Sequence, residues 1–367
     1  MKINQLILKA ATEPIKNMVP KKLLIPYYGY ILLTTTENGL EVRYTNQEAS
    51  YKTILTGGYE GEFNLCIDTT LIEALGDVDA FLSFKIQDKR CVVSVKGRRL
   101  TLPILDPKSY PIESAENKLL FHANSADIKK AIEKCSGFGT SEPMSAYYGT
   151  RFSKKDSCVE VGSTDNFVAG YSLVSISCDK SFGFNVNTAL CNVIRDICDK
   201  DELIHVLESD NDVQWQCGLS VLTTRKNSYR KTLVPYSDRL EKVVEVATDV
   251  VNISDRKWFV ESLRTSSLFS DNSATALVDI ILAENQITID VDSDVGKKSE
   301  QYIECIYDKT GDSTEVLLNY GSFLRILGKL EEKDIALRLP PEGDPISSPV
   351  YINEGDNHFF LFPSFKN

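Results

Sequence analysis

The chain has 367 residues, 42% hydrophobic and 25% charged, so it is too long for one ordinary domain and apolar enough to form a core. It has no run of about 18 apolar residues, and its first residues lack the apolar stretch and cleavage site of a secretion signal, so we expect neither a membrane span nor export. The formal net charge is −11, which disfavours nucleic-acid binding unless the 41 lysines and arginines gather on one surface.

Nine cysteines are scattered along the chain without a CxxC pair. Zinc sites and disulfide frameworks both need clustered cysteines, so this spacing predicts reduced thiols in a reducing cytosol. We therefore expect a cytoplasmic protein without a metal ion or another cofactor.

The first third of the chain begins with a helical pattern at residues 4–18, which Pro14 must kink or end. Alternating residues at 30–46 predict a β-hairpin. A β-like run followed by a helical run occupies residues 63–75, where Asp68 opens the helix because its carboxylate can accept hydrogen bonds from the first free amides.

The second third repeats this order. Residues 125–135 carry apolar side chains at i, i+3, i+4 and i+7, with Ser125 as the expected cap. A second hairpin pattern follows at 158–177, and a second strand-to-helix pattern at 182–194 opens with Asn187.

The last third has the same sequence of patterns. A helix is predicted at 254–269 with Ser254 or Asp255 as its cap, and a hairpin at 276–293. The third strand-to-helix pattern, at 316–327, has its expected cap within 320–322.

The same order of a helix, a hairpin and a strand-to-helix run thus occurs three times. This threefold repeat predicts a repeated α+β domain of roughly 120 residues with antiparallel sheets. The domain boundaries are predicted as 1–115, 116–247 and 248–367. Coincidence among generic α+β patterns is the alternative explanation.

Several segments match the landmarks of one known family in order and spacing. They are residues 97–112, the Thr-Asp loop within 162–170, residues 224–235, and the tail 358–365 with its hydrophobic-Pro-hydrophobic motif. Over nearly its whole length the chain thus resembles the β sliding clamp of bacterial DNA polymerase III. In that family three such domains form an arc, and two arcs close head to tail into a ring around duplex DNA.

The resemblance implies the DNA clamp fold, a homodimeric ring, and a non-catalytic processivity factor that encircles double-stranded DNA without reading its sequence. The implied protein partners are the replicative polymerase and the clamp loader, both bound through short peptides. Two departures from the family pattern are Asn166–Ala169, in place of Gly-His-Arg-Leu, and Phe362–Ser364, in place of the usual methionines. They predict a divergent bacterial or phage clamp with its own peptide preference.

Holding DNA regardless of sequence needs cations that face phosphates. Lysines and arginines on the predicted helices fit this need, and some form i, i+4 pairs whose mutual repulsion a polyanion would relieve. An ordinary solvated helix face is the alternative for each of them. The predicted DNA-binding set is Lys9, Lys22, Lys129, Lys130, Lys134, Arg195, Arg256, Lys257, Arg264, Arg325 and Lys329.

The resemblance also implies a peptide pocket and a subunit interface. Strand 97–104 would pair with the third domain of the partner subunit, so that Leu100 and Leu102 meet Leu268 and Phe269. The alternatives are completion of the last sheet for the tail, and internal core packing for the leucines. The implied pocket residues are Tyr147, Tyr148, Thr164, Phe167, Ala169, Pro235, Leu361, Phe362, Pro363 and Ser364.

Enzyme motifs are weak in this sequence. None of the three histidines has another histidine or a cysteine at i+3 or i+4, the glycines of 57–62 lack a following Lys-Ser/Thr, and the calcium-like run 290–296 lacks its glutamate. We therefore predict no catalytic site. The alternative function is an acidic α+β enzyme or a structural assembly protein with a duplicated domain.

Overall fold

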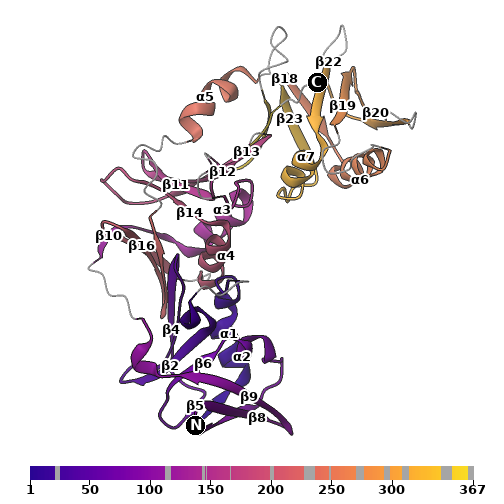
Figure 1. Ribbon diagram of the computed structural model, residues 1–367. Helices are drawn as coiled ribbons and strands as arrows, with labels where there is room; N and C mark the ends of the chain where they lie inside the picture. Colours follow the sequence, from indigo (N-terminus) through magenta and orange to yellow (C-terminus); the bar gives the residue numbers. More distant parts are fainter. Residues whose placement is uncertain are drawn as a thin grey trace. The chain divides into compact units, whose positions relative to one another are not determined.

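The computed structural model is an α+β protein in which every pair of neighbouring strands is antiparallel (Figure 1). The backbone divides into two compact units: a first unit of 1–129, 176–180 and 189–228, and a second unit of 130–175, 181–188 and 229–367. The predicted fold class is confirmed. The structure describes residues 1–20, 25–111, 117–142, 145, 147–165, 167–198, 202–226, 236–247, 249–269, 277–292, 298–307, 314–339 and 349–362.

A single sheet forms most of the first unit. It joins strands from the first third of the chain to strands from the middle third, because β17 pairs with β4 from Val221↔Lys52 to Thr224↔Ala49. In sheet order its strands are β10 (Lys118–Asn124), β15 (Leu203–Glu208), β16 (Asp212–Cys217), β17 (Ser220–Arg225), β4 (Ala49–Leu55), β3 (Gly39–Thr45), β2 (Tyr30–Thr36), β6 (Asn64–Asp68), β9 (Arg98–Leu105), β8 (Arg90–Val95), β7 (Phe81–Gln87), β1 (Lys2–Asn4) and β5 (Tyr59–Glu60).

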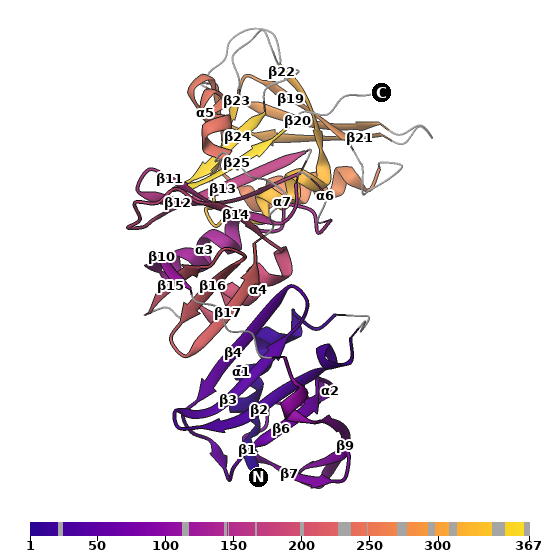
Figure 2. The same cartoon turned by 60° about the vertical axis from the view of Figure 1, so that its left-hand side comes forward.

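The second unit contains two sheets. The larger one joins the middle and last thirds, because β13 pairs with β25, as Figure 2 shows. Its order is β14 (Gly183–Val186), β11 (Thr150–Lys155), β12 (Cys158–Thr164), β13 (Val168–Ser175), β25 (Asn357–Leu361), β24 (Val350–Glu354), β23 (Ile335–Leu339) and β18 (Asp249–Ile253). The smaller sheet has the order β21 (Lys298–Glu304), β20 (Gln286–Asp292), β19 (Leu277–Ala283) and β22 (Thr314–Asn319).

Six of the helices follow the predicted order of two helices in each third. A further helix, α5, lies in a segment where the sequence analysis expected none. The helices are α1 (Gln5–Lys16), α2 (Thr70–Ala74), α3 (Ser125–Cys135), α4 (Thr188–Ile197), α5 (Tyr236–Val246), α6 (Arg256–Ser267) and α7 (Tyr320–Leu327), with 3-10 turns η1 (Pro26–Gly29) and η2 (Pro107–Ser109).

Side-chain caps explain where several helices begin. The Asn4 side chain accepts hydrogen bonds from the second and third amides of α1, and Asp255 accepts one from Trp258 in α6. The cap of α7 is Asn319, whose side chain accepts from the Ser322 amide, so the expected cap within 320–322 was wrong by one residue. Pro14 sits in the last turn of α1, which ends two residues later.

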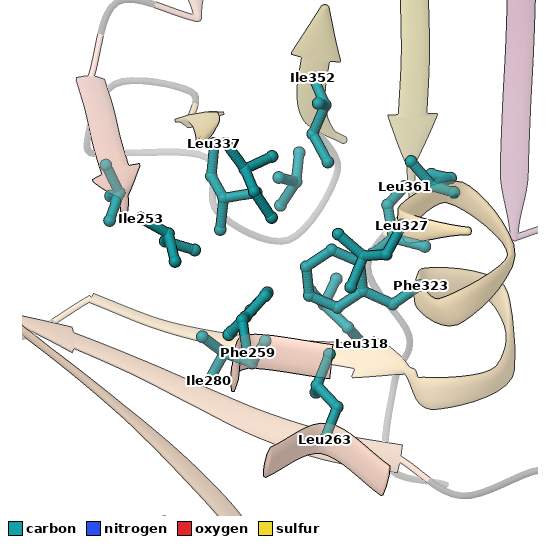
Figure 3. Close-up of a cluster of buried hydrophobic side chains, with 14 of the residues drawn as sticks. Ile253, Phe259, Leu263, Ile280, Leu318, Phe323, Leu327, Leu337, Ile352 and Leu361 are labelled. Carbon is teal, nitrogen blue, oxygen red and sulfur yellow. The ribbon is translucent and has the colours of Figure 1, made fainter. Parts of the chain in front are cut away.

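The core of the second unit gathers between α6, α7 and the strands around them (Figure 3). Phe259 of α6 and Phe323 of α7 are fully buried, with ring centroids 5.5 Å apart in an edge-to-face arrangement. Leu361, at the end of β25, belongs to the same cluster. The carboxyl-terminal strand is thus fixed by packing as well as by backbone pairing.

All nine cysteines are free thiols in the structure, and seven of them are buried. The two half-buried ones are Cys158 and Cys178. In the described part of the chain no helix is long and apolar enough to span a membrane.

Candidate functional site

Some of the predicted DNA-binding cations are open to solvent. Lys130 of α3 and Lys257 and Arg264 of α6 are exposed, and Lys129 is half-buried. No acidic side chain among the described residues forms an ion pair with any of these four. Their charges are therefore available to an external anion, while Lys22 lies outside the described residues.

Lys9 and Arg195 keep partial exposure but have acidic neighbours. The Lys9 ammonium lies 2.5 Å from an Asp77 carboxylate oxygen, and this hydrogen bond lowers the pKa of Asp77. Arg195 donates to its neighbour Asp196 at 2.7 Å. Because exposed pairs of this kind are weak, both cations can exchange partners at little cost.

Lys134 differs from the exposed lysines of the set because it is 3% exposed. Its ammonium lies 2.7 Å from Glu354 and 3.0 Å from Glu331, and it donates to the Lys329 carbonyl at 2.6 Å. Burial alone would raise the pKa of Glu354, but hydrogen bonds from Lys134 and from two backbone amides outweigh it and lower that pKa. The Lys134 charge is therefore balanced inside the second unit and is not available to DNA, unlike the charges of the exposed lysines.

Arg256 and Lys329 donate hydrogen bonds to backbone carbonyls at or near the ends of helices α7 and α3. The Arg256 guanidinium donates to the carbonyls of Leu327, at 3.1 Å, and of Leu330. The Lys329 ammonium donates to the Glu133 carbonyl at 2.5 Å. Carbonyls after the last turn of a helix lack partners within it, so cations in these places stabilise the fold.

Arg325 connects α7 to the Thr-Asp loop between β12 and β13. Its guanidinium lies 2.6 Å from an Asp165 carboxylate oxygen and donates to the carbonyls of Gly137 and Phe138. The other Asp165 oxygen accepts hydrogen bonds from the Phe167 and Val168 amides. Arg325 therefore supports the loop that the sequence assigned to peptide binding, a role that sequence reasoning missed.

Phe167 presents the main exposed apolar surface of this loop, with 44% of its area accessible. The Thr164 hydroxyl donates to the Val168 carbonyl, which closes the turn, and the Phe362 amide donates to the Phe167 carbonyl. The loop and the end of β25 are thus brought together as expected.

Other predicted pocket residues are less open. Ala169 is 3% exposed and Leu361 is fully buried, because they face the packed interior of the sheet. Their side chains support the loop and the tail from within rather than forming an open surface. Tyr147 and Tyr148 are half-buried just before β11, and Pro235, Pro363 and Ser364 lie outside the described residues.

The helix α5 packs on the same part of the larger sheet. Its Leu240, Val243 and Val244 join a cluster with Ala169 and Phe360, and Phe362 is partly buried there. The Glu160 carboxylate, 1% exposed, accepts hydrogen bonds from the first two amides of α5. The i, i+3, i+4 spacing of the apolar residues behind Ser237 and Asp238 was the signal that could have revealed this helix.

The four predicted interface leucine and phenylalanine residues are not equally exposed. Leu268, just after α6, is 76% exposed, Leu100 is 38% exposed and Phe269 is half-buried. Leu102 is only 7% exposed, which is the internal packing considered as its alternative. Leu102 shares a face of β9 with Leu100, two residues before it, and is buried where it pairs with the fully buried Cys91 of β8.

Both β9 and β21 have an open edge. β6 pairs with β9 only at Ile104 and Leu105, and within the described sheets residues 98–103 have a partner strand on one side alone. β21 is the terminal strand of the smaller sheet. The exposed charged side chains are Arg98 and Arg99 on β9, and Lys298, Glu300 and Glu304 on β21, so acidic groups outnumber basic ones on β21.

No family model and no curated protein matches the chain in sequence. Solved structures match it over its full length. The sliding clamp of Pseudomonas aeruginosa has a TM-score of 0.81 at 14% identity, and that of Caulobacter crescentus has 0.78 at 18%, each comparison covering 100% of this chain and 99% of the other. A putative DNA polymerase III β subunit from Eubacterium rectale has 0.80 at 13%, covering 99% and 98%.

The chain has the fold of the bacterial β sliding clamps. The resemblance stated from sequence motifs is therefore confirmed at the level of fold. The clamp fold here carries exposed helix cations, a Thr-Asp loop joined to the tail, and two open strand edges. Within the described ranges, no group of three or more His, Cys, Asp or Glu side chains is placed to hold a metal ion.

Lys134→Ala should lower the free energy of unfolding by about 3–5 kcal/mol, because it leaves the mostly buried Glu354 carboxylate without its cation. This decrease in the free energy of unfolding should have its full size at neutral pH. It should shrink as the pH falls through the lowered pKa of Glu354, where the carboxylate is protonated with or without the lysine. Urea unfolding of the full chain between pH 3 and pH 7 measures both effects.

Lys130→Ala is the matched control, since this lysine is exposed on the same helix and should change stability by at most about 0.5 kcal/mol. Equal destabilisation by the two substitutions, or a Lys134 effect that is the same at pH 3 and pH 7, would contradict the structural role of Lys134.

Proposed function

We propose that the chain is a DNA sliding clamp, a homodimer that closes into a ring around duplex DNA and tethers a replicative polymerase. The full-length agreement with solved clamps carries this proposal. A fold alone can serve several functions, so the proposal also rests on three surfaces that such a protein needs. The protein would work in the cytoplasm, without a catalytic site or cofactor of its own.

The first surface consists of the open cations Lys129, Lys130, Lys257 and Arg264. Ammonium and guanidinium groups on helices can contact phosphates without reaching base edges, which suits a protein that must move along any sequence. The net charge of −11 makes binding on an average surface unfavourable. Contact with DNA must therefore depend on exposed cations of the helices, and in the first unit Lys9 and Arg195 can contribute by exchanging partners.

The second surface is the pair of open edges on β9 and β21. An unpaired strand edge is a template for pairing with another chain, and a monomer would have to protect it. The arginines of β9 and the glutamates of β21 are complementary in charge, so we assign these edges to each other in a head-to-tail dimer. Beside β9 an apolar groove of about 360 Å³, lined in part by Leu71, Leu75 and Leu100, can receive Leu268 of the partner subunit.

The third surface is the Thr-Asp loop with the end of β25 and Phe362. Phe167 offers an exposed aromatic side chain on a turn that Asp165 and Arg325 hold in place. An ordered, exposed aromatic group is a typical anchor for a peptide. We assign this surface to short apolar segments of the polymerase and the clamp loader.

Replacing Lys129, Lys130, Lys257 and Arg264 by Ala should speed loss of the protein from nicked circular DNA. The slope of log affinity against log salt should flatten by about 0.9 for each phosphate that the variant no longer neutralises. The faster loss of the protein should not depend on base sequence, because contacts to phosphates carry no sequence information. Retention on nicked circular and linear DNA at several salt concentrations measures these effects.

The control variant replaces four exposed lysines outside the α-helices, Lys85, Lys89, Lys108 and Lys118, by Ala. It should retain DNA like the unchanged protein. The encircling proposal fails if both variants behave alike, or if the unchanged protein stays equally long on linear and circular DNA.

Charge reversal tests ring closure. Arg98→Glu with Arg99→Glu should give a folded monomer, and so should Glu300→Arg with Glu304→Arg, since each places like charges across the proposed edge pairing. A chain carrying all four changes restores opposite charges at both edges and should dimerise again. Sedimentation at dilute concentration distinguishes these outcomes; dimers in both two-site variants would move the interface elsewhere.

Phe167→Ala should weaken binding of fluorescent peptides from candidate polymerase tails at least tenfold, because a central aromatic anchor contributes about 2 kcal/mol or more. Phe81→Ala is a close match, since Phe81 is also 44% exposed but lies on β7 of the first unit. Fluorescence polarisation with both variants measures the difference. If the two substitutions have the same effect, the loop is not the peptide site.

A further inference from the structure

Two of the three histidines in the chain lie opposite each other on neighbouring strands. His122 of β10 and His205 of β15 are paired in the antiparallel register, with ring centroids 6.1 Å apart and ring planes at 49°. Both side chains are exposed. The third histidine, His358, is mostly buried and shares a 2.7 Å hydrogen bond with the Tyr351 hydroxyl.

The separation of the two rings suits joint binding of one metal ion. Directly opposite residues of an antiparallel pair have Cβ atoms about 4.5–5.5 Å apart. Imidazole nitrogens bind zinc at about 2.0–2.1 Å, which places the centres of two rings on one ion roughly 5–6 Å apart. Small side-chain rotations at an exposed site therefore bring one nitrogen of each ring to the same ion.

The surroundings favour a transition-metal ion over a hard cation. Alternation along β15 turns Ile204 and Val206 inward and His205 outward, and His205 faces Gln216 of β16 on its other side. On this face the residues next to the two histidines are amides and leucines, and the nearest carboxylate of β16 on the face, Asp212, is four residues from Gln216. Calcium and magnesium prefer carboxylate oxygens, whereas imidazole suits zinc, nickel and copper.

We propose that His122 and His205 form a bidentate site for a divalent transition-metal ion, with water in the remaining positions. The site lies within one sheet of the first unit and does not depend on the sliding-clamp proposal. A bound ion links β10 to β15, next to the irregular register between Leu119 and Phe121. Because the two rings meet only in the folded sheet, binding stabilises that strand pairing.

The test is titration of the full chain with Ni²⁺ and Zn²⁺ by calorimetry at pH 7.5, in degassed buffer without a thiol or phosphine reductant. We expect one ion per chain and a rise in melting temperature with added ion. His122→Asn and His205→Asn should each weaken binding at least tenfold. The double variant should lose no more than either single variant, because a chelate needs both rings. Asn124→Ala, on the same face of β10, should bind like the unchanged protein.

With Cu²⁺, electron paramagnetic resonance should show two equivalent nitrogen ligands in the unchanged protein, and not in either single variant. The proposal is overturned if the unchanged protein takes up no ion at millimolar concentration. It is also overturned if the single variants bind as tightly as the unchanged protein, which would assign the ion to the cysteines or to His358.

Discussion

Backbone pairing between strands that are far apart in sequence determines what the rest of this structure can do. The pairing of β13 with β25 runs from Val168↔Leu361 to Ser172↔Asn357, and it brings the carboxyl-terminal strand beside the Thr-Asp loop. The candidate peptide surface exists only because of this register, since a shift by one residue would turn Leu361 out of the core. The core around Phe259 and Phe323 then secures Leu361 from the other side.

Cations in this protein divide according to burial. Lys134, Arg256 and Arg325 sit where carbonyls or carboxylates would otherwise lack partners, so their charges serve the fold. Lys130, Lys257 and Arg264 have no such structural role among the described residues, and their side chains are exposed to solvent. An acidic chain can therefore present a locally basic surface, because most of its negative charge need not lie near that surface.

The helices could be predicted well from the sequence, because the apolar spacing that identifies a helix lies within the residues of that helix. Apolar spacing and polar caps identified six of them, and α3 was correct at both ends. The helix α5 was missed because the segment before it was interpreted through the family resemblance, although Leu240, Val243 and Val244 have helical spacing. Hairpins were also predictable, as β2 with β3 and β19 with β20 confirm.

Partners between distant strands could not be predicted, because alternation tells which face of a strand is buried and not which strand lies beside it. The same limit applies to the site. Lys130 and Lys134 lie on the same predicted helix, so there was no reason in the sequence to assign them different roles. Only the structure distinguishes them, because Lys130 is exposed and Lys134 is buried. Likewise, His122 and His205 are more than 80 residues apart and became a pair only through the register of β10 with β15.

The middle repeat, predicted at 116–247, gives β10 and β15–β17 to one sheet and β11–β14 to another. Its amides on β17 are therefore protected from hydrogen exchange by β4, and those on β13 by β25. Segments that open together in such a protein follow hydrogen-bonded sheets, so the cooperative units of this chain cross the borders of its repeats. A fragment that ends at the first border would leave the edge of β4 bare. The three repeats predicted from the sequence therefore share their sheets, and we do not expect any one of them to fold by itself.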